Sequence, residues 1–272
     1  MDAAVRLRDT GIRYSVCTLV TRPADWRAMA RSFAAAGFAP PDCEFLSLDN
    51  ATGNRFDAYA GYNIFLRAAC GAYVILCHQD VRLLSDGRDR LDAVIAELDS
   101  LDPHWGLFGN AGGLRSGALA IRISDPHGEN VAQGGPFPVA CQTLDENFIV
   151  VRAAANLAVS HDLHGFHLYG TDMCMLASIL GYSAYIVDFH LRHEGRGVID
   201  AVFARALTDL VHKYARTKWP AFVTASCGKF VIMPFDFLNK RLNTRGGLRF
   251  VMFAAHLANT ALRWVGIKRP PA

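Results

Sequence analysis

The 272-residue sequence lacks several features that would assign it to a specialised class. It has no uninterrupted apolar stretch near the roughly 20 residues that a membrane-spanning helix needs, and no signal-peptide pattern near its start. It contains no repeat of fixed period and no low-complexity tract, which excludes solenoid and disordered classes. The formal net charge is only +3, too weak an excess to indicate nucleic acid as the main partner. We therefore expect a cytoplasmic protein that does not bind nucleic acid.

Paired cysteine motifs are also missing. The seven cysteines form no CxxC pair, are odd in number, and in several cases lie inside apolar runs. A free cysteine in such a run behaves as a small hydrophobic residue, so a reducing compartment fits best. The first strand-like segment is not followed by a G-x-G-x-x-G motif, which argues against a dinucleotide-dependent oxidoreductase.

What the sequence does contain is a regular alternation of strand-like and helix-like segments, with half of its residues hydrophobic. Apolar, strand-like runs of this kind separated by helical spacing predict a mainly parallel sheet with helices on both faces. The expected strands cover residues 12–20, 43–48, 73–77, 105–110, 183–187 and part of 141–152. The expected helices cover residues 26–36, 55–70, 91–101 and 171–180, and the Gly-rich stretch 111–138 is interpreted as loops and hairpins.

The C-terminal quarter has a different character. Residues 203–214 and 248–264 have helical patterns, and basic residues surround the apolar positions of the second one. We therefore divide the chain into a domain at residues 1–200 and a helical extension at residues 201–272. A basic, apolar helix is typical of contact with an anionic membrane surface. Packing on the domain or on a partner subunit is the alternative.

Polar residues that end buried strands are the first candidates for a site, because ligands bind beyond the carboxyl ends of parallel strands. Asp49 and Asn50 could bind a ribose or a base edge, although the pattern by itself favours an ordinary Asx turn. Asp80 follows the apolar strand 73–77 and, with His78 beside it, could hold a divalent cation that bridges two phosphates. The alternative for Asp80 is a capping carboxylate at a turn.

Three features further along the chain complete the candidates. Asp172 lies near the start of a predicted helix, where it is either a general base or a first-turn acid. Asn63 lies inside a helical pattern and faces either solvent or a site. His193, after the last core strand and close to His190, could complete the shell of a cation. Arg196 lies in a Gly-rich loop that could close over phosphates, or that is simply solvated.

Two stretches, residues 54–83 and 161–195, resemble a bacterial glycosyltransferase-like family related to the family 2 glycosyltransferases. In the first, an Asn-containing helix precedes an apolar strand that ends in a short acidic motif. The family 2 relatives have Asp-x-Asp there, and this chain has His78-Gln79-Asp80. In the second, a "yG.D" segment, a short helix, a strand and a closing histidine follow one another. The resemblance implies a GT-A fold, with a mainly parallel sheet flanked by helices.

The same resemblance implies a role for each candidate. Asp80 and His193 would hold Mn²⁺ or Mg²⁺ on the diphosphate of a UDP- or GDP-sugar, and Asp172 would be the base of an inverting transfer. The donor nucleotide sugar would be bound by Asp49, Asn50, Asn63, His78, Gln79 and Arg196. The acceptor would be a hydroxyl of a glycan or of a lipid-linked molecule, as in polysaccharide biosynthesis. A non-catalytic protein that binds nucleotide sugars is the alternative.

Overall fold

The computed structural model describes residues 11–197, 199–216 and 220–264. Its first part is a β-α-β-α-β unit, as the sequence predicts: β1 (Tyr14–Val20), α1 (Pro23–Ala35), β2 (Cys43–Asp49), α2 (Ala58–Ala68) and β3 (Tyr73–Cys77). Local signals set the helix starts. Pro23 occupies the first turn of α1, where its missing N–H costs nothing, and the Asp57 carboxylate caps α2 by accepting the Ala60 N–H.

The middle of the chain adds two helices and the remaining strands of the domain. Residues 111–138 form hairpins, as expected, and the helix predicted at residues 171–180 begins two residues earlier. The elements are β4 (Val81–Leu83), α3 (Arg88–Leu101), β5 (Trp105–Gly109), β6 (Ala111–Gly113), β7 (Leu119–Asp125), β8 (Gly128–Gln133), β9 (Val139–Ala140), β10 (Thr143–Leu144), β11 (Phe148–Arg152), η1 (Ala153–Ala155), α4 (Tyr169–Ile179), β12 (Ser183–Ile186) and β13 (Leu191–His193).

The main sheet has seven strands in the order β2-β1-β3-β11-β5-β12-β9. The β1–β2, β1–β3 and β5–β12 pairs are parallel, whereas β11 runs antiparallel to both of its neighbours and β9 antiparallel to β12. Because of the reversal, the start of β11 pairs with the end of β3 at Phe148 and Cys77. The loop that precedes β11 therefore reaches the same edge of the sheet as the loops that follow β1, β2 and β3.

A second sheet joins β10, β6, β7, β13 and β4 in that order, with β8 paired to β7. Within it, β13 pairs antiparallel with β4, and His193 lies opposite Val81. Since β4 begins directly after Asp80, this pairing brings the end of β13 to the carboxyl end of β3.

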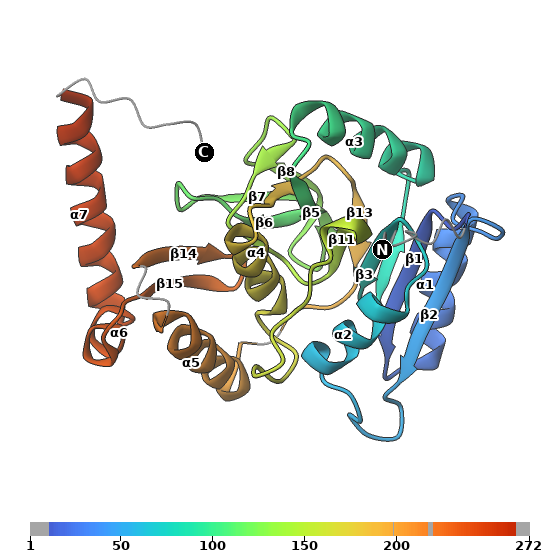
Figure 1. Cartoon of the computed structure of the whole chain (residues 1–272), viewed down its shortest axis with the longest axis horizontal. Helices are drawn as coiled ribbons and strands as arrows, with labels where there is room; N and C mark the ends of the chain where they lie inside the picture. Colours follow the sequence, from blue (N-terminus) through green and yellow to red (C-terminus); the bar gives the residue numbers. More distant parts are fainter. Residues whose placement is uncertain (1–10, 198, 217–219, 265–272) are drawn as a thin grey trace, which may run out of the picture.

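Helices cover both faces of the main sheet, as the sequence predicts. Alternate residues of β1, such as Val16 and Cys17, belong to two different core clusters. One cluster packs against α1 and α3, and the other against α2 and α4. In Figure 1, α4 and α3 lie on the two sides of the central strands. This arrangement explains why the strands are apolar on both faces.

The C-terminal extension contains helices over both predicted stretches, residues 203–214 and 248–264, and also a hairpin that the sequence analysis does not predict. It contains α5 (Ala201–Ala215), a hairpin of β14 (Ala221–Ala225) and β15 (Gly228–Ile232), α6 (Asp236–Leu242) and α7 (Arg245–Trp264). The hairpin packs on the second sheet, where the Thr143 hydroxyl donates to the Thr224 carbonyl at 2.6 Å. Residues of α5 and the hairpin, among them Leu210 and Val223, share a core cluster with the main sheet. The hydrophobic core thus continues across residue 200, and a division of the chain there stays a prediction.

Candidate metal centre and adjoining pocket

His78, Asp80 and His193 come together at the carboxyl end of β3. Their nearest ligand atoms all lie within 4.8 Å of one another. Nδ1 of His78 is 3.3 Å from Nε2 of His193, which is 3.5 Å from Oδ1 of Asp80. Two ligands with bonds of ~2.1 Å to one ion lie about 3–4 Å apart. The spacing of these three side chains therefore fits a divalent cation.

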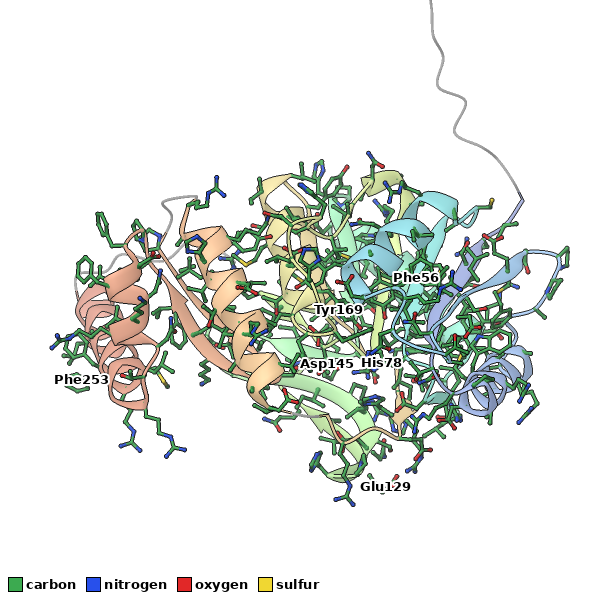
Figure 2. The ribbon with its side chains drawn as sticks, turned by 90° about the horizontal axis from the view of Figure 1, so that it is seen from below. Phe56, His78, Glu129, Asp145, Tyr169 and Phe253 are labelled. Atoms are coloured by element: carbon green, nitrogen blue, oxygen red, sulfur yellow. The ribbon has the colours of Figure 1, made fainter. Side chains whose placement is uncertain are left out.

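The orientation of the His78 ring is fixed by Tyr169. The Tyr169 hydroxyl donates to the carbonyl of Glu146 at 2.9 Å, so its oxygen can only accept from Nε2 of His78, which is also 2.9 Å away. That contact assigns the ring hydrogen of His78 to Nε2 and leaves the Nδ1 lone pair directed at His193. Fixing the tautomer of a ligand histidine through its other nitrogen is typical of metal sites. Figure 2 shows His78 and Tyr169 together in the middle of the molecule, with Asp145 beside His78.

The charges of the three side chains suit the same purpose. Burial, together with the charge of His193, lowers the pKa of His78 to about 4, so its imidazole is neutral at neutral pH. Burial would raise the pKa of Asp80, but the hydrogen bond and charge of His193 lower it to about 2. Burial would lower the pKa of His193, yet Asp80 outweighs it and raises that pKa. In the absence of a cation, the Asp80 carboxylate therefore favours the protonated form of His193.

The chain segment after His193 closes tightly over these groups. The Glu194 N–H donates to the Asp80 carbonyl at 3.1 Å. A Cβ on Gly195 would lie 2.9 Å from Oδ2 of Asp80 and 3.0 Å from Nε2 of His193. Only glycine fits this position without displacing one of the two side chains. On the open side of the cluster, Nη2 of Arg22 lies 3.6 Å from Oδ2 of Asp80.

A pocket of about 240 Å³ adjoins the cluster and is lined by residues that include His78, Asp80 and Tyr169. Asn50 and Gln79 also line it, but their amides are occupied. Asn50 holds the backbone of Phe56 through both of its amide atoms. Gln79 accepts from the N–H groups of residues 21 and 22. Both predicted binding residues therefore shape the loops around the pocket.

The other predicted binding residues lie outside the pocket lining. Asp49 is exposed and accepts from the Ala51 N–H, which is the Asx turn that the sequence left open. Asn63 bonds both backbone polar groups of Val159 and so ties α2 to the loop before α4. Arg196 is exposed and directly follows the closing glycine, and its guanidinium forms no ion pair with any residue that the structure describes.

The predicted base Asp172 does not face the pocket. Its side chain is fully buried, and its carboxylate accepts from the Ser160 N–H, the Ser160 hydroxyl and the Tyr214 hydroxyl at 2.6–2.7 Å. Burial raises its pKa. The expectation of a carboxylate open to an acceptor hydroxyl is therefore corrected: in this geometry Asp172 joins α4 to the preceding loop and to α5.

Two carboxyl groups of the site escaped the sequence analysis. Asp145 and Glu146 lie in the loop before β11, and the charge of Asp145 acts on both His78 and His193. Burial would raise the pKa of Asp145, but hydrogen bonds from Ser226 and Asn147 lower it, so the group is ionised. Their position depends on the antiparallel direction of β11, which the pattern of apolar residues does not reveal.

The comparisons with known proteins agree with this architecture. No model of a known protein family matches the chain. Among solved structures, the TarS protein of S. aureus in complex with UDP superposes with a TM-score of 0.50 at 14% identity, over 74% of this chain and 65% of that one. The mannosyltransferase PcManGT of Pyrobaculum calidifontis, in complex with GDP-Man and Mn²⁺, gives 0.50 at 15% identity, over 75% and 64%. GalNAc-T7, solved with UDP, GalNAc and Mn²⁺, superposes with a TM-score of 0.50 at 10% sequence identity, over 76% of this chain and 50% of that one.

The chain therefore has the GT-A fold of glycosyltransferases, and it spans less than two thirds of the length of each of these structures. A nearer relative in sequence is the "ATP synthase subunits region ORF 6" protein of Fuscovulum blasticum. It is 39% identical over 214 residues, which are 76% of this chain and 86% of that protein. At this identity and coverage, the chain belongs to the family of the ORF 6 protein.

Proposed function

We propose that the protein is a glycosyltransferase that moves a sugar from a nucleoside diphosphate sugar to a hydroxyl group. The observation that carries the proposal is the cluster of His78, Asp80 and His193 at the mouth of a pocket, at the carboxyl end of the parallel strands of a GT-A fold. Ligands of such sheets bind at this edge. The S. aureus and P. calidifontis proteins were solved with UDP and with GDP-Man, which supports a UDP- or GDP-sugar as the donor.

The three side chains would hold the cation through the two imidazoles and the carboxylate. Imidazole ligands suit transition metals, and Mg²⁺ prefers oxygen ligands alone, so this set favours Mn²⁺ over Mg²⁺. When bound, the cation would offset the negative charge on the departing nucleoside diphosphate. His78, which stands where relatives have an acid, would then be a third ligand in addition to the predicted Asp80 and His193.

Two arginines flank the cluster and would bind the diphosphate oxygens. Arg22 already contacts Asp80 from the loop after β1, and its side chain is well exposed. Arg196, which the sequence indicates, extends from the loop that Gly195 closes. Guanidinium groups suit this task because they bind phosphate oxygens through two parallel hydrogen bonds. The nucleoside would lie in the pocket beside Asn50 and Phe166.

Direct displacement of the nucleoside diphosphate also requires a base for the acceptor hydroxyl. Asp172 is enclosed, whereas Asp145 is ionised, partly exposed and adjacent to the histidine pair. Asn147 holds one carboxylate oxygen of Asp145 through its N–H at 3.0 Å and its side-chain amide at 2.5 Å. We assign the proposed base role to Asp145, with its orientation set by Asn147.

A second candidate function is the binding of a nucleotide sugar without transfer. The enclosure of Asp172 is the observation that favours it, because the resemblance implies that this residue is the base. Both candidates require the same donor site, so binding alone cannot separate them, and turnover must be measured as well.

Thermal unfolding with UDP or GDP, each with and without Mn²⁺, tests the donor site in the wild type and in Asp80→Ala. We expect a Mn²⁺-dependent rise in melting temperature that the variant loses, because a ligand stabilises the state that binds it. Asp49→Ala, outside the pocket lining, is the matched control. No stabilisation of the wild type by any of these combinations would contradict the proposed donor site. Hydrolysis of UDP- and GDP-sugars then separates transfer from binding alone.

The place of action is the second part of the proposal. Among the described residues no helix is long and apolar enough to cross a membrane. Yet Phe250, Phe253 and Leu257 recur at i, i+3 and i+7 on α7 and are 66%, 61% and 52% exposed. From Gly228 to Trp264 the sequence has six Lys or Arg residues and one acid, Asp236. Figure 1 shows α7 at one end of the molecule, and Figure 2 shows Phe253 at the outer edge of the molecule.

An exposed apolar stripe among cations fits the surface of an anionic membrane better than a neutral protein surface. We therefore propose that α6 and α7 attach the protein to such a surface, where lipid-linked acceptors are found.

A further inference from the structure

A second cavity, of about 760 Å³, lies between α4, the edge of the main sheet at β9 and β12, and the C-terminal hairpin. It is separate from the pocket beside His78, with no lining residue in common. Its volume falls within the range of roughly 300–1,000 Å³ that is typical of sites for small molecules. The proposed transfer reaction leaves it without a role.

The interior of this cavity is neutral. Its deepest lining residues include Cys141, Cys174, Val223 and Ile232, all buried. Burial raises the pKa of the Cys141 thiol well above its usual range, so no thiolate forms there at neutral pH. Among the residues that the structure describes, Arg115 is the only charged side chain in the lining, and it is exposed.

The polar groups of the lining are mostly occupied elsewhere. The Gln142 amide donates to the Phe222 carbonyl at 2.9 Å and accepts from the Thr224 N–H at 3.3 Å. The hydroxyls of Tyr185 and Tyr214 donate to Asp102 and Asp172, respectively. These residues therefore present mainly carbon atoms to the cavity, and the hydroxyls of Ser178, Tyr182 and Ser183 are the further polar side-chain groups of the described lining.

The mouth has the opposite character. Arg115 lies in the turn between β6 and β7, is exposed, and forms no ion pair within the described residues. The ammonium of Lys229 lies near the same turn, 3.7 Å from the position of a Cβ on Gly117. A free guanidinium beside a second cation binds phosphate or carboxylate through charge-assisted hydrogen bonds.

We propose that this cavity is a binding site for an anionic amphiphile, with its apolar chain among the buried residues and its phosphate or carboxylate head at Arg115. The inference goes beyond the proposed sugar transfer and does not depend on it. A neutral apolar ligand would leave Arg115 without a function, and a free anion would leave the apolar interior empty. Only a ligand that combines both parts uses the whole site.

Calorimetric titration of the full chain tests the site without nucleotide or metal, so its result is separable from the fate of the donor site. The probes are decyl phosphate, decanoate, 1-decanol and inorganic phosphate, all below the concentrations at which micelles form. We expect decyl phosphate or decanoate to bind, and the comparison of the two identifies the preferred head. Inorganic phosphate should not bind measurably, and 1-decanol should bind more weakly by about tenfold, the usual worth of a hydrogen bond to a charged group.

Two variants locate the binding. Ser178→Trp, at an exposed position of α4 that lines the cavity, puts an indole ring in the space for the ligand and should abolish binding of the amphiphile. Ser100→Trp, exposed on α3, is its control. Arg115→Gln should weaken the binding of decyl phosphate by about tenfold and leave the binding of 1-decanol unchanged. Arg31→Gln on α1 should change neither affinity. Binding that survives Ser178→Trp, or that both tryptophan variants reduce equally, would overturn the proposal. So would a failure of both decyl phosphate and decanoate to bind the wild type.

Discussion

Nδ1 of His78 lies 3.3 Å from Nε2 of His193, although 115 positions separate the two residues in the chain. His78 directly follows β3 of the main sheet, and His193 is the last residue of β13 in the second sheet. The pairing of β13 with β4 joins the two sheets at this point. The proposed metal centre therefore depends on the contact between the sheets, and it gives several predictions.

Replacing Tyr169 by phenylalanine should weaken Mn²⁺ binding by about 10–100-fold, as is usual when a partner of a ligand histidine is lost. The change removes the oxygen that accepts from Nε2 of His78 and frees the Glu146 carbonyl. Calorimetry with Mn²⁺ measures the effect. Tyr59→Phe, whose hydroxyl bonds the His167 carbonyl instead, should leave the affinity unchanged. Equal affinities for wild type and Tyr169→Phe would remove Tyr169 from the site.

Gly195→Ala should separate Asp80 from His193, because the new methyl group would stand within 3.0 Å of both. We expect a loss of about tenfold or more in Mn²⁺ affinity, comparable to other changes around metal ligands. Gly246→Ala in α7, where nothing lies within 4 Å of the added carbon, is the matched control. Unchanged metal binding in Gly195→Ala would mean that the loop after His193 does not close on the ligands.

The two carboxylates that compete for the role of base should respond differently to amidation. Asp172→Asn places an NH₂ group against hydrogen-bond donors, so we expect it to destabilise the fold by about 1–3 kcal/mol. Asp145→Asn keeps an oxygen to accept from Asn147 and should unfold near the wild-type temperature. Its transfer rate should fall by at least about a hundredfold, the contribution of a general base.

Thermal unfolding and a donor–acceptor transfer assay on both variants check this prediction. A stable Asp172→Asn without turnover, beside an active Asp145→Asn, would return the role of base to Asp172. If both variants are stable and bind the donor but do not transfer the sugar, the transfer step requires both carboxylates.

Glu146 should make the protein less stable as the pH rises. Burial and the charge of Asp145 raise the pKa of Glu146 from 4.5 to about 8. The pKa of Glu146 in the folded state lies above its pKa in the unfolded state. The contribution of Glu146 to the free energy of unfolding is therefore complete below pH 4.5 and is lost as the pH rises through about 8. The side chain keeps some contact with solvent, so we expect on the order of 2 kcal/mol.

Urea unfolding at pH 5, 6.5 and 8 measures this dependence. Glu146→Gln stays neutral, so its free energy of unfolding should no longer show the decrease with pH that Glu146 causes. Glu97→Gln, at an exposed position of α3, should show the same pH dependence as the wild type. Identical pH profiles for wild type and Glu146→Gln would show that Glu146 ionises normally in the folded state.

The apolar stripe of α7 should bind anionic lipid. Replacing Phe250 and Phe253 together by serine should reduce co-sedimentation with phosphatidylglycerol vesicles by at least about tenfold, because both rings lose their contact with the bilayer. Arg245→Gln with Arg249→Gln should weaken binding at low salt, by about fivefold for each charge. Leu101→Ser, which removes an exposed apolar side chain from α3, is the control. Unchanged sedimentation would indicate that α7 packs against a protein instead.

Much of the fold was readable in the sequence because local signals agree with it. The strand at Tyr73–Cys77 has the predicted bounds, and the ring of Pro23 and the carboxylate of Asp57 mark the starts of α1 and α2. The parallel arrangement of the first three strands followed from their apolar character on both faces. The position of Asp80 at a carboxyl end was a consequence of that arrangement.

Other features were decided only by tertiary structure. The direction of β11 is one of them, since an apolar strand reads the same in either direction, yet that direction brings Asp145 to the site. The hairpin at Ala221–Ile232 is another, because its stability comes from packing on the second sheet.

The two residues with the most definite sequence hypotheses illustrate the same limit. The resemblance implies that His78 binds the donor nucleotide sugar, and Tyr169 orients its ring so that it can act as a metal ligand. The sequence predicts that Asp172 is either a general base or a first-turn acid, and the hydroxyl of Tyr214, 42 positions further along the chain, donates to its carboxylate and helps to enclose it. A sequence determines which chemical groups are present and which elements carry them. Which partner each group meets depends on contacts between distant segments, and in both cases that partner sets the role of the side chain.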